Sequence, residues 1–216
     1  DLRGHGPNPQ RRGDIDYIGQ FEDDLADLIE QQARDGQRVV MLGHSSGGGL
    51  VIRYAGGTHG ADLDGAVLLA PFVQYDAPTA RPNSGGWAHV MTRRIIGLSM
   101  LNMAGITALN HLQIIQFQFP DAVLDGPLGH TATQAYSFRL NTGYAPRRDW
   151  QADIAALPPF LLVVGDQDEA FVADAYAPTF SAITDDGQYA IVPANHLGVV
   201  NAPETLARLT EFLTAN

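Results

Sequence analysis

Apolar residues along the chain follow two alternating patterns. Short continuous apolar runs, typical of strands buried in a parallel sheet, occupy residues 38–42, 65–72, 160–166 and 188–194. Stretches with apolar residues at helical spacing occupy residues 14–35, 50–55, 169–177 and 203–214. Because strand and helix patterns take turns along the chain, we expect an α/β fold with a mostly parallel sheet and helices on both faces.

The alternation breaks in the middle of the chain. Between residues 76 and 149, glycine, proline and asparagine separate short amphipathic pieces. We interpret this segment as an insertion that forms a cap over one end of the sheet, with residues 1–75 and 150–216 as the core. Its apolar residues either pack the cap against the core or, in part, line an apolar substrate pocket, for which Met103 is a candidate.

The net charge of the chain argues against one class of binding partner. The chain has 216 residues, with 24 acidic and 13 basic side chains and a formal net charge of −11. A surface of this sign repels phosphate backbones, which argues against nucleic-acid binding. We expect the acidic stretch 22–30 to be a solvated face and the arginine pairs at 93–94 and 147–148 to be solvated helix ends, with binding of a carboxylate as the alternative for the arginines.

The sequence lacks the residues or residue patterns that disulfides, zinc sites and membrane spans require. The chain has no cysteine, so it has no disulfide and no thiolate metal site. No two histidines have zinc-ligand spacing on a helix. No run of 18 apolar residues occurs, so we expect no membrane span within these residues. A cytoplasmic location is favoured, with a signal or anchor in a preceding segment as the alternative, and the oligomeric state is left open.

The stretch "GHSSG" at residues 43–47 carries the first chemical signal. It lies between a predicted strand and a predicted helix, which is the context of a nucleophile elbow centred on Ser45. We expect Gly43 and Gly47 to be small because the two backbones nearly touch there, and His44 to shape the turn. The backbone N–H of Ser46 would then bind a developing oxyanion. A glycine-rich anion-binding loop, or Ser46 as the nucleophile, are the alternatives.

A serine nucleophile needs a base and an acid, and both follow later strands. His196 comes just after the fourth apolar run. Asp166 and Asp168 come after the third; Asp166 could instead cap the next helix, and we favour Asp168 as the acid. Phe171 and Leu197 adjoin the acid and the base, so we expect them to line the substrate site.

Together these segments resemble one family of enzymes. "DLRGHG" at 1–6, "GHSSGG", "LLVVGDQDEAF" and "NHLG" are similar to motifs of the α/β-hydrolase superfamily, most of all its serine-aminopeptidase and monoacylglycerol-lipase-like branch. The resemblance implies a triad of Ser45, His196 and Asp168, and its G-x-x-D acid loop favours Asp168 over Asp166. It also implies that no cofactor and no metal take part.

The resemblance departs from the family at the start of the chain. In the family, several strands precede the "DLRGHG" loop, together with a loop that supplies the second oxyanion N–H. We therefore expect an incomplete N-terminal part, and a chain that by itself is poorly stable and weakly active because one sheet edge is uncovered.

The predicted function is hydrolysis of a small-molecule carboxylic ester. A short or medium acyl chain is favoured, as in a monoglyceride or a lysophospholipid. The alternatives are an aminopeptidase-like amide hydrolase and a non-catalytic binding module on the same fold.

Overall fold

The computed structural model describes residues 1–215, except for the side chains of residues 83 and 84. The chain forms two compact units. One consists of Asp1–Phe21 and Pro82–Gly143, and the other of Glu22–Arg81 and Tyr144–Asn216. We call them the N-terminal unit and the sheet unit, and describe each by itself.

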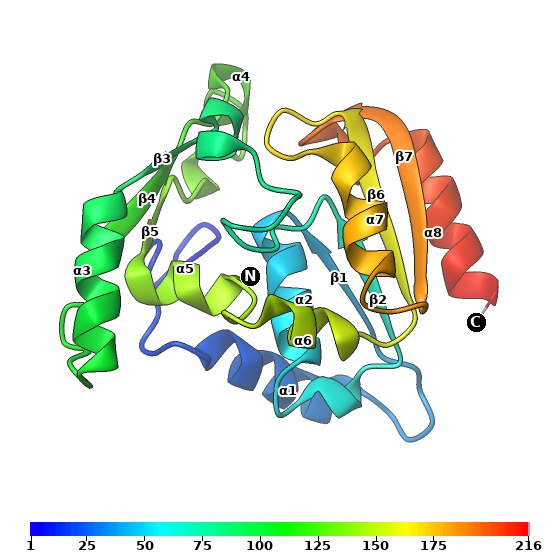
Figure 1. Cartoon of the computed structure of the whole chain (residues 1–216), viewed down its shortest axis with the longest axis horizontal. Helices are drawn as coiled ribbons and strands as arrows, with labels where there is room; N and C mark the ends of the chain where they lie inside the picture. Colours follow the sequence, from blue (N-terminus) through cyan, green and yellow to red (C-terminus); the bar gives the residue numbers. More distant parts are fainter. Residues whose placement is uncertain (216) are drawn as a thin grey trace. The chain divides into compact units, whose positions relative to one another are not determined.

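The sheet unit contains four parallel strands in the order β1-β2-β6-β7 (Figure 1). They are β1 (Val40–His44), β2 (Gly65–Leu69), β6 (Phe160–Gln167) and β7 (Gly187–Asn195). Each strand lies where an apolar run predicts one, within a few residues at each end. The predicted α/β fold with a parallel sheet is therefore confirmed.

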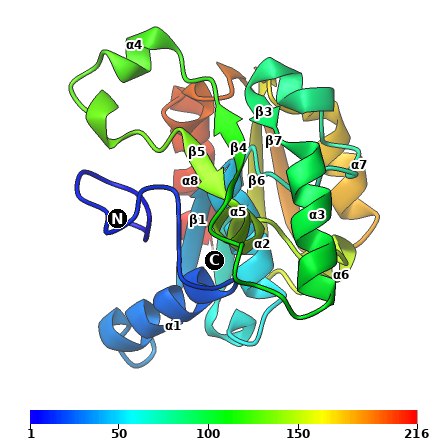
Figure 2. The same ribbon diagram turned by 90° about the vertical axis from the view of Figure 1, so that its left-hand side faces the viewer.

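Helices cover both faces of this sheet. In Figure 2, α8 lies on one side of the strands, and α2 and α7 lie on the other. The helices of this unit are α1 (Gln20–Gln32), which begins in the N-terminal unit, α2 (Ser46–Ala55), α6 (Trp150–Ala155), α7 (Tyr176–Ser181) and α8 (Pro203–Ala215). Short 3₁₀ turns are η1 (Gly60–Asp62), η4 (Ala173–Ala175) and η5 (Gly198–Val200).

The N-terminal unit has a sheet of its own, with three antiparallel strands in the order β3-β4-β5. The strands are β3 (Ala88–Val90), β4 (Gln113–Phe117) and β5 (Ala135–Ser137). The helices are α3 (Thr92–Met103), α4 (Asp121–Leu124) and α5 (Phe138–Tyr144), and the 3₁₀ turns are η2 (Pro82–Gly86) and η3 (Gly129–Thr131). Leu98, Ile114 and Phe138 form its buried cluster. The sequence did not predict this sheet, because two of its strands have only three residues and β4 lacks a clean alternation.

The first 21 residues belong to this unit and not to the core assigned from the sequence. The N–H of Ser137 donates to the carbonyl of Gly13, at 2.8 Å. The Arg139 side chain forms an ion pair with Asp14, and Ile15 is fully buried. These contacts join the N-terminal loop to β5 and α5. The predicted role of residues 76–149 as a cap over the sheet stays a prediction.

The first apolar run is less buried than we expected. All five residues of β2 are buried, but Leu42 in β1 has an exposed fraction of 49%. Among the described strands, β1 pairs only with β2, so it forms an edge of the sheet. The expectation of burial on both faces is therefore correct for β2 and wrong for β1.

Two of the charged residues expected in solvent lie in a buried ion cluster. Glu22 is buried, and its carboxylate oxygens each lie 2.6 Å from a guanidinium nitrogen, Nε of Arg53 and Nη2 of Arg147. Arg147 also pairs with the buried Asp153, at 2.9 Å. The expectation of a solvated side chain is wrong for Glu22, whose buried charge is paired with two guanidinium groups. Arg147 is paired as well, but its side chain keeps an exposed fraction of 35%.

Candidate active site

Ser45 lies at a sharp turn between β1 and α2. Its φ of 54° and ψ of −118° give it a positive-φ backbone conformation that residues other than glycine seldom adopt. The neighbouring chain holds this conformation: the N–H of Ser45 donates to Leu69 O at 2.9 Å, and its carbonyl accepts the N–H of Phe72 at 2.9 Å. A strained serine between a strand and a helix is the geometry of a nucleophile elbow.

Glycine is required on the strand side of this turn. A Cβ on Gly43 would lie 2.2 Å from the carbonyl oxygen of Gly47, and a Cβ on Gly48 would lie 2.7 Å from Pro71. Gly49 faces the carbonyl oxygen of Phe72 equally closely. A Cβ on Gly47 would meet no atom within 4 Å, so the steric requirement expected there is wrong. On the helix side of the turn, the close approach falls instead on Gly48 and Gly49, where α2 packs onto the loop after β2.

Gly43→Ala is therefore expected to destabilise the protein. The new Cβ would clash with the backbone carbonyl of Gly47, and neither backbone segment can move away without distorting the turn at Ser45. The loss in unfolding free energy should be roughly 1–3 kcal/mol. Gly47→Ala is the matched control, since it lies in α2 with open space beside it and should leave stability unchanged or raised by about 0.5–1 kcal/mol. Chemical denaturation of both variants measures the difference, and equal stabilities would contradict this interpretation of the elbow.

The structure brings Ser45 together with the histidine and the acid predicted from the sequence. His196 Nε2 lies 3.0 Å from Ser45 Oγ, and His196 Nδ1 lies 2.8 Å from Asp168 Oδ2. The side chains of His196 and Asp168 have exposed fractions of 1% and 0%. The acid and the histidine follow β6 and β7, and the carboxyl ends of parallel strands meet at one edge of a sheet. This explains how residues so far apart in the sequence come into contact.

The loop after β6 holds the Asp168 carboxylate in one orientation. Its Oδ1 accepts the backbone N–H groups of Ala170 and Phe171, each at 2.8 Å, which leaves Oδ2 for His196. Asp166, the other candidate acid, lies within β6 with an exposed side chain. The sequence preference for Asp168 therefore agrees with the geometry.

Two further side chains bind the backbone of His196. Glu169 Oε2 accepts the His196 N–H at 3.0 Å, and His44 Nε2 lies 2.8 Å from the His196 carbonyl oxygen. Burial lowers the pKa of His44 to about 4, and the nearby His196 ring makes a smaller contribution in the same direction. The His44 ring is thus neutral at pH 7 and donates from Nε2–H. The sequence assigned His44 to the turn alone and did not identify Glu169, because no local pattern marks either contact.

The predicted substrate-lining residues lie in different places. The Phe171 ring packs edge-on against the His196 ring, with centroids 5.2 Å apart, and Leu197 follows the histidine with a half-buried side chain. The sequence did not single out Phe72, whose ring centroid lies 6.4 Å from that of Phe171. Met103 belongs to the N-terminal unit and has an exposed fraction of 88%. The lining role of these residues stays a prediction.

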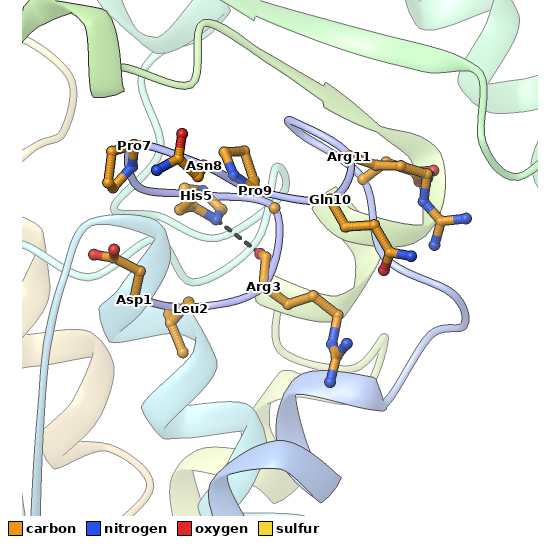
Figure 3. A pocket seen from close by; sticks show the side chains of 11 residues that line it. Asp1, Leu2, Arg3, His5, Pro7, Asn8, Pro9, Gln10 and Arg11 are labelled. Atoms are coloured by element: carbon orange, nitrogen blue, oxygen red, sulfur yellow. Dashed lines mark hydrogen bonds and ion pairs between the residues drawn. The ribbon is translucent and has the colours of Figure 1, made fainter.

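A cavity of about 300 Å³ lies in the N-terminal unit, and its wall consists of residues between Asp1 and Asp14 (Figure 3). Within this wall, His5 Nδ1 donates to the carbonyl of Arg3 at 3.0 Å, and burial lowers the pKa of His5. This cavity shares no residue with the group around Ser45.

In the described part of the chain, no cluster of three or more His, Cys, Asp or Glu side chains could hold a metal ion. Over the same residues, no helix combines the length and the apolar character that crossing a membrane requires.

Comparison with known protein families shows which family the chain belongs to. Residues 1–194 match the family described as "Serine aminopeptidase, S33". No curated protein sequence matches the chain.

Solved structures share the fold at low sequence identity. The monoacylglycerol lipase of Paleococcus ferrophilus has a TM-score of 0.70 and 19% identity, and the match covers 100% of this chain and 81% of the lipase. An esterase from Thermogutta terrifontis has a TM-score of 0.62 and 20% identity, with 100% and 78% covered. A soluble variant of the monoglyceride lipase of Saccharomyces cerevisiae has a TM-score of 0.64 and 16% identity, with 99% and 73% covered. The chain is therefore an α/β-hydrolase and belongs to the serine aminopeptidase S33 family.

Proposed function

We propose that this protein hydrolyses carboxylic esters with short or medium acyl chains, such as monoglycerides or lysophospholipids, through Ser45, His196 and Asp168. The observation that supports the proposal is the continuous chain of hydrogen bonds from Ser45 Oγ through the His196 ring to Asp168. Two similar structures are described as monoacylglycerol or monoglyceride lipases and a third as an esterase, which favours an ester as the substrate.

In the acylation step, Ser45 Oγ attacks the ester carbonyl carbon while its proton moves to His196 Nε2. The C–O bond to the leaving alcohol then breaks, and the alcohol takes that proton from Nε2. Asp168 accepts the hydrogen bond from Nδ1–H throughout, so it maintains the tautomer in which Nε2 is free to act as the base. Water repeats the sequence on the acyl-enzyme and releases the carboxylic acid.

The negative charge that develops on the carbonyl oxygen needs donors in place before the reaction. The backbone N–H of Ser46 is in the first turn of α2, where the N–H groups have no partner within the helix. The positive end of the helix dipole is at the same position and stabilises the same charge. We assign Ser46 N–H as one oxyanion donor.

The same machinery acts on amides in an aminopeptidase, and the family description favours this second candidate. The two functions differ in the leaving group, since an amine must be protonated before it departs, whereas an alkoxide is a much weaker base than an amide anion and departs with less help from His196. A panel of p-nitrophenyl acyl esters and aminoacyl p-nitroanilides, assayed on the intact protein, separates them. Turnover of the anilides but not of the acyl esters would replace the ester proposal with the amide one.

Covalent labelling tests the nucleophile without knowledge of the substrate. A fluorophosphonate probe should form an adduct on Ser45 of the intact protein, located by peptide mass spectrometry, and heat-denatured protein should remain unlabelled. Denatured protein controls for non-specific reaction, because only the folded elbow activates the hydroxyl. A folded protein that shows neither labelling nor turnover would instead support a non-catalytic binding module.

A further inference from the structure

A segment that lies far from the acid in the sequence binds the loop that carries it. We call residues 168–172 the acid loop and residues 79–81, which directly precede Pro82–Gly143, the linker segment. The N–H of Val172 donates to the carbonyl of the buried Thr79 at 2.9 Å. Ala80 and Phe171 form an isolated antiparallel bridge. Both segments belong to the sheet unit, so these contacts lie within one compact body.

The side chain of Arg81 adds two hydrogen bonds to the same loop. Its Nε donates to the carbonyl of Phe171 at 2.7 Å, and its Nη2 donates to the carbonyl of Asp168 at 3.3 Å. Arg53 and Arg147 in this unit pair with carboxylates, whereas Arg81 forms no ion pair among the described residues. An arginine that binds two carbonyls of one loop fixes their relative position, because its donors lie in a rigid planar fork.

These bonds complement the ones inside the loop. Asp168 Oδ1 accepts the N–H groups of Ala170 and Phe171, and Oδ2 faces His196. The loop's own N–H groups therefore orient the carboxylate, and Arg81 holds the carbonyls at both ends of the same turn. Phe171 also packs edge-on against the His196 ring, so a shift of the turn would move both the acid and a neighbour of the base.

We infer that Arg81 is a positioning residue, which keeps the acid loop in the conformation that presents Asp168 Oδ2 to His196. Arg81 acts through the loop and does not touch the reacting atoms. The inference rests on the proposed function, in which Asp168 orients the histidine. A displacement of an orienting group by about 1 Å costs about 10²-fold in rate, so the contribution of Arg81 should appear in kcat and not in KM.

The test compares Arg81→Ala and Arg81→Lys with the unaltered intact protein. Arg148→Ala is the matched control, because Arg148 is an exposed arginine of the same unit. We expect Arg81→Ala to lower kcat on an acyl ester roughly 10- to 100-fold with KM little changed, and Arg81→Lys to fall between it and the unaltered protein. Added methylguanidinium should restore part of the activity of Arg81→Ala, since the side chain it replaces is open to solvent.

A second readout does not depend on turnover. The proton on His196 Nδ1 in its bond to Asp168 gives a low-field ¹H NMR resonance, which should broaden or disappear in Arg81→Ala and persist in Arg148→Ala. An unchanged kcat and an unchanged resonance in Arg81→Ala would overturn the inference. So would a fall in activity that only follows a fall in the folded fraction, without methylguanidinium rescue.

Two remaining outcomes are also decisive. If Arg81→Ala does not fold, a folded Arg81→Lys with unchanged kcat and resonance overturns the inference, and a reduced kcat supports it. If the unaltered protein hydrolyses neither esters nor amides, the proposed function fails, and the resonance alone then decides whether Arg81 positions Asp168.

Discussion

Ser45→Ala is expected to lower kcat on an ester substrate by on the order of 10⁴- to 10⁶-fold. In the proposed mechanism the variant removes the atom that attacks the carbonyl, and a water molecule activated by His196 is a poor replacement. Some rate above that of the uncatalysed reaction should remain, because the variant keeps the Ser46 N–H that we propose as an oxyanion donor. Steady-state kinetics on the intact protein measure the loss, and a thermal melt close to that of the unaltered protein shows that the fold persists.

Ser46→Ala is the matched control for this experiment. It removes a hydroxyl one residue away and keeps the backbone N–H, which is the only part of Ser46 that the mechanism uses. Its kcat should stay close to that of the unaltered protein. The opposite result, with activity retained in Ser45→Ala and lost in Ser46→Ala, would assign the nucleophile to Ser46.

Asp168→Asn is expected to lower kcat by about 10⁴-fold with little loss of binding. The structure predicts the orientation of the asparagine, because the N–H groups of Ala170 and Phe171 require an acceptor at the position of Oδ1. The amide NH₂ must then face His196 Nδ1 and donate to it. This moves the histidine proton to Nε2, where it prevents His196 from accepting the proton of Ser45.

The pH dependence and a second variant check this argument. Asp166→Asn changes a carboxylate two residues earlier, on an exposed side chain, and should leave kcat nearly unchanged. Because the wrong tautomer cannot act as a base, activity of Asp168→Asn should rise only at alkaline pH, where hydroxide takes the role of the base. Equal losses in both variants would mean that charge near the site, and not the tautomer, sets the rate.

The sequence predicted the parts of the site that short-range constraints govern. A serine with a positive φ between a strand and a helix demands Gly43 two residues before it, so the elbow is visible in five consecutive residues. The meeting of serine, acid and histidine follows from the parallel sheet, since each residue lies just past the carboxyl end of a strand and these ends share one edge. Apolar runs therefore located β1, β2, β6 and β7, and with them the positions of Asp168 and His196.

The sequence was least informative where structure depends on pairing between distant segments. The antiparallel sheet of the N-terminal unit consists of short strands, and its third strand also binds the loop around Gly13. An acidic side chain at position 22 has the pattern of a solvated helix face, but Arg53 and Arg147 come from other parts of the chain to bury it. In both cases the partners have no fixed sequence spacing.

The sequence by itself thus determined the fold class, the elbow and the three residues of the proposed triad, because sterics at a turn and the period of buried strands act over a few residues. Only the tertiary structure decided which groups orient that triad. Glu169 and His44 hold the backbone of His196, and Arg81 holds the acid loop from a segment ninety residues away. Hydrogen bonds of this kind depend on where folded segments meet, which no local pattern of residues records.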